Sequence, residues 1–250
     1  MHALIFDIDG TFADTERDGH RVAFNLAFRE AGLDWRWDEV LYGELLRVAG
    51  GRERLLHWMR RILPDDLLDG AAREDVARQL HAAKTRHYVE LVARGCVALR
   101  PGIARLVEEA RTAGLRLAIA TTTSRANVEA LLAHTLGPQA VDWFAAIACG
   151  EDAPAKKPDP GVYACVLRAL GLAAGQCLAL EDSGPGLAAA RAAGVPTVVT
   201  RNPYTHDHVF EGALAVVDAL GDGAGAPCVG LDELRRWHAA ARPDGAFLLH

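Results

Sequence analysis

The sequence predicts an α/β protein whose core is a doubly wound, Rossmann-like parallel sheet and which carries an inserted all-helical unit. Half of the 250 residues are hydrophobic, which is enough to bury one large domain or one domain with an insertion. Short apolar runs that end in polar or acidic residues alternate with helical patterns along most of the chain. Between the first run and the second, residues 15–94 instead show helical periodicity almost throughout.

Five apolar runs have the length and the boundaries of buried parallel strands. They are Ala3–Phe6, Leu115–Ala120, Ala145–Ala148, Cys177–Leu180 and Thr197–Val199. About 20 to 30 residues separate the last four, which leaves room for one crossover helix in each gap. Helical patterns fill these gaps at Arg125–Leu136, Gly161–Leu170 and Gly186–Ala193. This alternation is typical of a doubly wound sheet.

The long helical region predicts a separate domain over residues 15–95, so the core domain would comprise residues 1–14 and 96–250. The helices expected in it are His20–Ala31, Asp38–Val48, Glu53–Leu63 and Arg73–Arg94. Helix breakers separate them at Gly32, Gly50-Gly51 and Pro64. Arg100-Pro101-Gly102 marks the return to the sheet. Near the end, we expect a surface loop at Gly221–Gly230 and a last helix at Leu231–Ala241.

Composition argues against several classes of function. The chain has 27 basic and 33 acidic residues, and this net charge of −6 argues against broad nucleic-acid binding. No apolar run approaches the roughly 20 residues of a membrane span, and the N-terminus has no positively charged leader. Five scattered cysteines without a Cys-x-x-Cys pair indicate neither a disulfide framework nor a zinc site. We therefore expect a cytoplasmic protein, and a monomer because the two-domain plan needs no partner.

Acidic pairs follow two of the expected strands. Asp7-Ile8-Asp9-Gly10-Thr11 follows the first strand, where Gly10 lets the chain turn, and Glu181-Asp182 follows the fourth. In an open parallel sheet, ligands bind beyond the carboxyl ends of the strands. If these two strands are neighbours, their carboxylates repel one another unless a divalent cation lies between them. Oxygen ligands of this kind suit Mg²⁺.

Groups that can bind phosphate lie beside these acids. Thr121-Thr122-Thr123 ends the second strand just ahead of a helix, where hydroxyl and backbone N–H groups can hold phosphate oxygens. Lys157, in Lys156-Lys157-Pro158, supplies a positive charge before another helix. Carboxylates, a metal ion, hydroxyls and a lysine together indicate phosphoryl transfer, in which positioning and charge neutralisation do most of the catalysis.

In this order, after successive strands, these motifs resemble those of the haloacid dehalogenase superfamily. The resemblance rests on Asp7-x-Asp9-Gly10-Thr11, Thr121, Lys157-Pro158 and Glu181-Asp182-Ser183-x-x-Gly186. It extends from Met1 to about Asp218, and the helical insertion after the first motif is similar to the first (C1-type) class of caps in that superfamily. Within the superfamily, the chain is most similar to the CbbY group of sugar-phosphate phosphatases, which are related to the β-phosphoglucomutases.

The resemblance implies a role for each matching residue. Asp7 would be the nucleophile that forms an aspartyl-phosphate, and Asp9 the general acid and then the general base. An acid at position 9 favours a phosphatase or phosphomutase, because the dehalogenases and P-type ATPases of the superfamily lack it. Mg²⁺ would be held by Asp7, the backbone carbonyl of Asp9 and Asp182, with Glu181 bound to the ion or beside its ligands. The transferring phosphoryl group would be bound by Thr121, Thr122 and Lys157.

The expected cap is neutral: residues 15–98 include 14 basic and 14 acidic residues, so the rest of the chain carries the whole charge of −6. Arginines nevertheless cluster between Arg47 and Arg61, around Gly50-Gly51. A glycine turn that opens a helix beside Arg52 is a candidate second anion site. The resemblance places His20, Arg52 and Lys84 over the active site, with Glu16 and Tyr42 as weaker candidates. We expect Arg54, Arg60 and Arg61 to be solvated.

Two phosphate sites indicate a small sugar bisphosphate as the substrate, and the CbbY resemblance points to xylulose 1,5-bisphosphate. One alternative is a phosphomutase that returns the phosphoryl group to the sugar, and another is a non-catalytic sugar-phosphate-binding protein. We expect the cap to move on hinges near residues 14–16 and 94–100. Two acids keep two interpretations each: Asp14 caps the following helix or supports the site, and Asp152 is a loop acid or supports the metal.

Overall fold

The computed structural model describes residues 1–64, 67, 69–222 and 228–241, and these residues confirm the predicted α/β architecture. Their six strands form one parallel sheet in the order β3-β2-β1-β4-β5-β6. The strands are β1 (Ala3–Phe6), β2 (Arg116–Ala120), β3 (Phe144–Ala148), β4 (Cys177–Glu181), β5 (Thr197–Thr200) and β6 (Ala215–Val217). The strand order reverses between β1 and β4, so the carboxyl ends of these neighbours form the crevice in which doubly wound sheets bind ligands.

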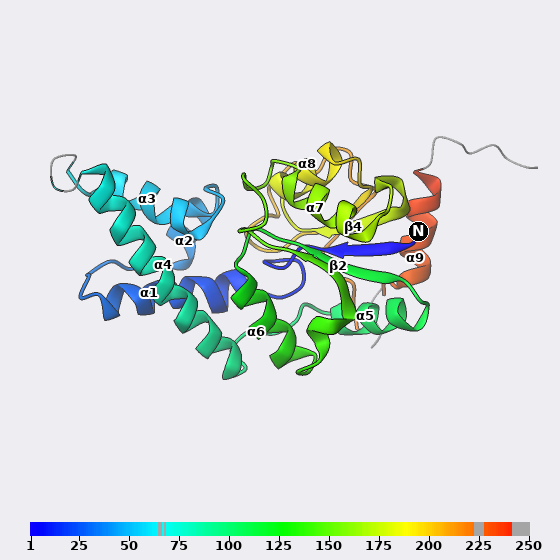
Figure 1. Ribbon diagram of the computed structural model, residues 1–250, viewed down its shortest axis with the longest axis horizontal. Coiled ribbons are helices and arrows are strands. Elements are labelled where there is room, and N and C mark those ends of the chain that lie inside the picture. The colour runs from blue at the N-terminus through cyan, green and yellow to red at the C-terminus, as the bar shows by residue number, and fades with distance from the viewer. Residues whose placement is uncertain (65–66, 68, 223–227, 242–250) are drawn as a thin grey trace, which may run out of the picture.

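Helices cover both faces of this sheet (Figure 1). One face packs against α5 (Ile103–Thr112), α6 (Arg125–Thr135) and α9 (Leu231–Ala240). The other face packs against α7 (Gly161–Leu170) and α8 (Gly184–Ala192). Two short 3₁₀ turns, Ala140–Trp143 and Ala174–Gln176, precede β3 and β4. Successive residues of β1 alternate between the two hydrophobic clusters, because neighbouring side chains of a strand point to opposite faces.

Two elements of the core domain were not predicted. In α5, Ile103, Leu106, Val107 and Ala110 are buried at helical spacing, so the signal was present directly after the expected return to the sheet. Strand β6 is only three residues long, lies at the edge of the sheet and is partly exposed, so its pattern is too short to recognise.

The inserted helices, here called the cap, pack around an aromatic cluster of their own. They are the π-helical turn η1 (Glu16–His20), α1 (Arg21–Glu30), α2 (Glu39–Leu45), α3 (Gly51–Ile62) and α4 (Gly70–Ala93). Phe24, Phe28, Trp37 and Tyr42 are fully buried in this cluster. The side-chain amide of Asn25 donates to the carbonyl of Trp37 and accepts from its N–H, each at 2.8 Å, and so holds the chain between α1 and α2.

A glycine turn separates α2 from α3, where the sequence predicts a break. Gly50 has a φ of +93°, and a Cβ at this position would collide with the side chain of Glu53. Glycine therefore allows α3 to begin at Gly51, directly beside the candidate anion-binding residue Arg52.

The two chain segments that join the cap to the core domain run side by side. The N–H of Asp14 donates to the carbonyl of Ala98 at 3.1 Å, and the N–H of Arg100 donates to that of Phe12 at 3.0 Å. On the core side of this junction, α4 of the cap packs against α6 (Figure 1). In the described part of the chain, no helix is both long enough and apolar enough to cross a membrane.

Candidate active site

The carboxyl ends of β1 and β4 bring three buried carboxylates together. Asp7 follows β1, and Glu181 and Asp182 lie at the end of its neighbour β4. One oxygen from each of the three lies within 4.8 Å of the others. Gly10 makes the turn after Asp7 with a φ of +84°, and a Cβ there would overlap the carboxylate of Asp182. Glycine therefore lets the loop after β1 lie this close to Asp182.

Lys157 is the cation at the centre of this cluster. Its Nζ donates to Asp7 Oδ1 and Glu181 Oε1, each at 2.6 Å, and to the carbonyl of Ala120 at 2.8 Å. Burial lowers the pKa of Lys157, but Asp7 and Glu181 outweigh burial and raise it above its ordinary value, so Lys157 stays protonated. Tyr163 of α7 donates its hydroxyl to the same Glu181 oxygen at 2.5 Å. Tyr163 was not predicted, because a tyrosine on an apolar helical face looks like a core residue.

The cluster combines three carboxyl groups with the single ammonium group of Lys157. Burial raises the pKa of Asp7 to about 7 despite Lys157, and burial together with the neighbouring carboxylates raises the pKa of Asp182 well above its ordinary value. Among the described residues, Glu181 Oε2 is buried without a hydrogen-bond partner. Three clustered carboxylates, with an unpaired acceptor among them, form a donor set that fits a hard divalent cation.

Asp9 contacts the cap directly. Its Oδ1 accepts a hydrogen bond from Thr15 Oγ1 at 2.7 Å and lies 2.8 Å from Nε2 of His20, which η1 presents from the cap. Burial raises the pKa of Asp9, but His20, Thr15 and Lys84 together outweigh burial and lower it to about 2. Asp9 is therefore ionised in this arrangement.

The two predicted threonines after β2 differ in position. Thr122 lines the cleft between the cap and the core domain, whereas Thr121 is buried and its Oγ1 accepts from the N–H of Thr123 at 3.2 Å. Both stand just before α6, at the carboxyl end of a strand that neighbours β1. Thr122 is thus the more accessible of the two.

The cleft between the cap and the core domain has two arms. Both are lined by Asp9, Glu16, Gly50, Arg54 and Thr122. The first, here called the arginine arm, has a volume of about 240 Å³ and is also lined by Gly51, Arg52, His81, Lys84 and Lys156. The second, here called the loop arm, has a volume of about 860 Å³ and runs between α2 and residues 202–209, past Asp7 and Asp182.

The predicted cap cations line the arginine arm. Lys84 is buried, its Nζ lies 5.2 Å from the ring centre of Phe24, and burial lowers its pKa to about 8. Arg52 is half exposed, and its guanidinium lies 3.5 Å from Glu53 and 4.0 Å from Glu74. Such long, exposed ion pairs are weak, so Arg52 can turn towards an anion in the cleft.

The expectation that Arg54 is solvated is wrong, whereas Arg60 and Arg61 are exposed as expected. Arg54 is buried and donates to Tyr42 Oη at 3.0 Å, and Tyr42 donates to Glu16 Oε2 at 2.5 Å. This chain of contacts needs α3 to pack against α2, which helical periodicity does not reveal. Of the two weaker candidates, Glu16 lines both arms of the cleft, whereas Tyr42 is fully buried and contacts the cleft through Glu16.

His81 was assigned no role from the sequence, yet it lines the arginine arm. Burial and the nearby cations lower the pKa of His81 to about 4, so its imidazole is neutral.

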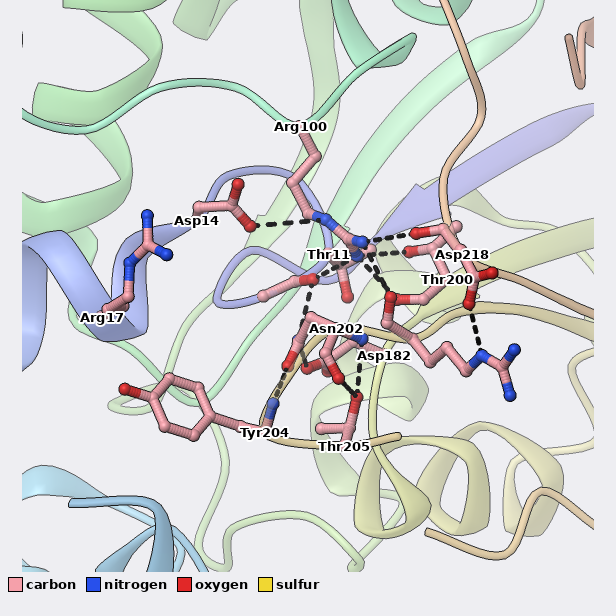
Figure 2. Close-up of polar contacts among 12 residues, drawn as sticks. Thr11, Asp14, Arg17, Arg100, Asp182, Thr200, Asn202, Tyr204, Thr205 and Asp218 are labelled. Atoms are coloured by element: carbon pink, nitrogen blue, oxygen red, sulfur yellow. Dashed lines mark hydrogen bonds and ion pairs between the residues drawn. The ribbon is translucent and has the colours of Figure 1, made fainter. Parts of the chain in front are cut away.

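Asp14 and Asp152 lie outside the cluster formed by Asp7, Glu181 and Asp182. Asp152 Oδ2 accepts from the N–H of Cys149 at 2.8 Å and from Arg125 at 3.0 Å, so it is a loop acid. Asp14 does not cap the following helix; its Oδ1 lies 3.5 Å from Nε of Arg100 (Figure 2). Arg100 in turn donates to the carbonyl of Gly10 at 2.7 Å. It thereby joins the segment that leads from the cap back to the core domain, here called the second linker, to the loop after β1.

Asn202, in the loop after β5, is a further residue of the site that was not predicted. Its Nδ2 donates to Asp182 Oδ2 at 2.7 Å and to the carbonyl of Gly10 at 3.2 Å (Figure 2). A lone asparagine after a short strand carries no signal of this contact, which depends on β4 and β5 being neighbours in the sheet.

Comparison with known proteins agrees with this geometry. A family model described as haloacid dehalogenase-like hydrolase matches residues 1–194. The plasmid-encoded protein CbbY of Cupriavidus necator is 53% identical over 251 residues, which cover 95% of this chain and 97% of the relative. A phosphoglycolate phosphatase of Rhodospirillum rubrum is 33% identical over 239 residues, which cover 93% of this chain and 94% of that protein.

Solved structures extend the comparison to the fold. CbbY from Rhodobacter sphaeroides in complex with phosphate superposes with a TM-score of 0.84, and a mutant of it in complex with xylulose-(1,5)bisphosphate with one of 0.83. Both are 42% identical to this chain and cover 94% of it and 99% of the solved chain.

Proposed function

The chain belongs to the haloacid dehalogenase-like hydrolase family and is a phosphatase of that family, and from this premise we propose that it hydrolyses xylulose 1,5-bisphosphate or a closely related small sugar bisphosphate. The proposal includes Mg²⁺ as the cofactor and an aspartyl-phosphate on Asp7 as the intermediate. The observation that carries it is the position of Asp7, whose carboxylate contacts Lys157, belongs to the acidic cluster and lines the loop arm.

Asp7 is oriented for nucleophilic attack. Lys157 donates to its Oδ1 at 2.6 Å and Thr11 Oγ1 donates to its Oδ2 at 3.2 Å, so the carboxylate is held by one group on each oxygen. In the first step, an Asp7 oxygen would form a bond to phosphorus while the bond from phosphorus to the sugar oxygen breaks. Lys157 stays protonated and would offset the negative charge of the transferring group.

Asp9 would supply a proton to the leaving sugar oxygen and later accept one from water. The ionised state of Asp9 in this arrangement is the one that accepts the proton in the second step. For the first step Asp9 must carry a proton, and a movement of the cap that takes His20 and Lys84 away from it would remove two of the contacts that lower its pKa. Cap movement and proton transfer are therefore linked in this proposal.

The acidic cluster is the proposed metal site. Asp7, Asp182 and the backbone carbonyl of Asp9 would hold Mg²⁺, with Glu181 bound to it or beside its ligands. When bound, the ion supplies positive charge to the oxygens of the phosphoryl group. Removing the ion with a chelator is expected to abolish phosphate release.

The arginine arm supports a bisphosphate rather than a monophosphate. Arg52 and Lys84 line it on the cap side and Lys156 on the core side, and Asp9 belongs to both arms. A substrate whose reacting phosphate lies at Asp7 can thus extend past Asp9 and place its second phosphate among these cations.

Phosphate release tests the proposal. The full-length protein is assayed with Mg²⁺ over sugar mono- and bisphosphates, and the substrates are ranked by kcat/KM. We expect release of free phosphate with xylulose 1,5-bisphosphate ranked first. An isomerised sugar phosphate without free phosphate would support the phosphomutase alternative instead. Binding without any turnover would support the non-catalytic one.

A further inference from the structure

The loop after β5 contacts both the acidic cluster and the cap within three residues of chain (Figure 2). At one end of this segment, Asn202 is buried and its Nδ2 donates to Asp182 Oδ2 and to the carbonyl of Gly10. One amide group therefore sets the rotation of the Asp182 carboxylate and its distance from the loop after β1. Hydrogen-bond partners of this kind orient the ligands of a metal site.

At the other end of the segment, the ring of Tyr204 rests on the cap. A Cβ added to Gly43 of α2 would lie 3.2 Å from Cδ1 of Tyr204, so the ring packs directly over this glycine. The ring also meets Tyr42 in a T-shaped contact with 6.2 Å between centroids. Among the described residues, Tyr204 is the one hydrophobic side chain of the core domain that packs against the hydrophobic cluster of the cap. Its hydroxyl is buried and has no hydrogen-bond partner there, so the ring makes this contact.

Hydrogen bonds within the loop join Asn202 to Tyr204 and Thr205. The N–H of Tyr204 donates to Asn202 Oδ1 at 2.9 Å, which is the other end of the amide that holds Asp182. The N–H of Asn202 donates to Thr205 Oγ1 at 3.0 Å, and the N–H of Thr205 donates to the carbonyl of Asn202 at 3.0 Å. Pro203 further restricts the backbone between them. The backbone that carries the Tyr204 ring is therefore hydrogen-bonded directly to the Asn202 amide.

The base of the loop is fixed independently. Arg100 is buried and donates to the carbonyls of Gly10, Thr200 and Arg201 at 2.7 to 2.8 Å (Figure 2). These bonds hold the end of β5 against the loop after β1 whether or not Tyr204 is seated. The Arg100 bonds thus hold the end of the strand, whereas residues 202–205 are the part of the loop that contacts the cap.

We propose that Asn202 and Tyr204 are positioning residues that couple the seating of the cap on the core domain to the affinity of the acidic cluster for its divalent cation. With Tyr204 seated over Gly43, Asn202 holds Asp182 in its binding orientation. By reciprocity, the bound ion favours the seated cap by the same factor. The inference rests on the proposed function, because it assigns a metal ion to the acidic cluster.

Binding of Mg²⁺ alone to the full-length protein, measured by calorimetry without substrate, tests the coupling. Tyr204→Ala is expected to weaken Mg²⁺ binding about five-fold or more, although Tyr204 does not contact the carboxylates. Tyr204→Phe is the matched control and is expected to bind Mg²⁺ within about twofold of the native protein, because the hydroxyl has no partner to lose. Asn202→Ala is expected to weaken binding about 10- to 100-fold.

A variant on the cap side separates coupling from stability. Gly43→Ala pushes on the Tyr204 ring from α2, while alanine favours the helix more than glycine does. We expect it to weaken Mg²⁺ binding about two- to five-fold without lowering the thermal midpoint, and to have no further effect in Tyr204→Ala. Likewise, Asn202→Ala with Tyr204→Ala is expected to bind Mg²⁺ no more weakly than Asn202→Ala alone.

The inference is overturned if Tyr204→Ala and Tyr204→Phe bind Mg²⁺ equally well, or if the effects of Tyr204→Ala and Asn202→Ala multiply. These outcomes are independent of the substrate. A native protein that releases phosphate from xylulose 1,5-bisphosphate while the Tyr204 variants bind Mg²⁺ alike overturns the coupling and leaves the proposed function standing. Coupled Mg²⁺ affinities in a protein that releases no phosphate would support the coupling and overturn the proposed function.

Discussion

The two walls of the cleft hold their charged groups by different means. On the core wall, Asp7 and Glu181 are buried at strand ends, and Lys157, buried in the loop before α7, donates to both at 2.6 Å. On the cap wall, Arg52 is half exposed and its ion pairs span 3.5 and 4.0 Å, and Lys84 is held over aromatic rings. The core wall is thus preorganised for one chemical step, whereas the cap wall can adjust to the far part of a substrate.

This contrast predicts a graded series of effects. A change on the core wall removes the reaction, because each group there has one position and several partners. A change on the cap wall alters affinity or selectivity, because the groups there act on a distant part of the substrate. Loss of the ion pair between Asp14 and Arg100 in the linkers alters little, because this contact is long and its carboxylate is half exposed.

The largest effect is expected from Asp7→Asn. The amide oxygen and nitrogen keep the shape of the side chain but lack the nucleophilic charge, so phosphate release is expected to fall at least about 1,000-fold. The measurement is kcat with the best substrate at saturating Mg²⁺. Turnover within about tenfold of the native rate would remove Asp7 as the nucleophile and with it the contrast between the walls.

A matched control exists on the same domain. Asp152→Asn also removes one carboxylate, but that carboxylate holds a loop and is absent from the acidic cluster. Its phosphate release is expected to stay within about twofold of native. A large loss of activity would return Asp152 to the alternative of a metal-supporting acid.

The same contrast explains how much was predictable from the sequence. The fold class and the acidic strand ends could be predicted, because the carboxyl ends of neighbouring parallel strands always meet at one edge of the sheet. Asp7 and Asp182 come together for that reason, whereas Lys157 reaches Asp7 from the loop before α7, whose course the strand order does not determine. Tyr163 and Asn202 join them through the packing of α7 and the neighbouring β5, which leave no motif.

Prediction on the cap wall was weaker for a physical reason. Helical periodicity shows which face of a helix is buried, but not which neighbouring helix covers it. Arg54 was therefore expected in solvent, although α2 covers it and Tyr42 accepts its hydrogen bond. His81 was missed in the same way. His20 could be placed only through the family resemblance, since nothing in its spacing shows the 2.8 Å approach to Asp9.

The next effect is a pH dependence from the cap wall. Burial lowers the pKa of Lys84 to about 8, so its positive charge is complete well below pH 8 and is lost as the pH rises through that value. If Lys84 attracts the substrate, kcat/KM is expected to fall about tenfold between pH 8 and pH 10, because it reports groups of the free enzyme. Bound phosphate favours the charged lysine, so kcat is expected to fall at higher pH than kcat/KM.

Lys84→Arg tests whether Lys84 causes this fall of kcat/KM at alkaline pH. Arginine keeps its charge throughout the range, so the alkaline fall of kcat/KM is expected to disappear or to move above pH 10, whatever the absolute rate. If kcat/KM depends on pH in Lys84→Arg as it does in the native protein, another group causes the alkaline fall. In that case the cap would not contribute charge to substrate capture through Lys84.

A smaller effect is expected from Arg52→Ala. The loss of one partly exposed guanidinium should lower kcat/KM for bisphosphates about fivefold and leave that for monophosphates within about twofold. Arg60→Ala is the matched control, because Arg60 is exposed on the same helix and does not line the cleft. If the ratio of the two kcat/KM values does not change in Arg52→Ala, the arginine arm does not bind the second phosphate.

The smallest effect is expected in the linkers, from Asp14→Asn. Asp14 is half exposed and 3.5 Å from Nε of Arg100, so the free energy of unfolding should change by less than about 0.5 kcal/mol. Arg100 keeps its hydrogen bonds to the carbonyls of Gly10, Thr200, Arg201 and Asp218, and these hold the linker in place.

Arg100→Lys is the comparison for Asp14→Asn, with urea unfolding as the measurement. A lysine keeps the charge but does not serve all of the acceptors that Arg100 serves, so some buried carbonyls lose their donor. The expected loss is at least about 2 kcal/mol. If Asp14→Asn costs as much as Arg100→Lys, the exposed ion pair stabilises the linker as strongly as the buried bonds do. The linker would then be as rigid as the core wall, and movement of the cap would require the ion pair between Asp14 and Arg100 to break.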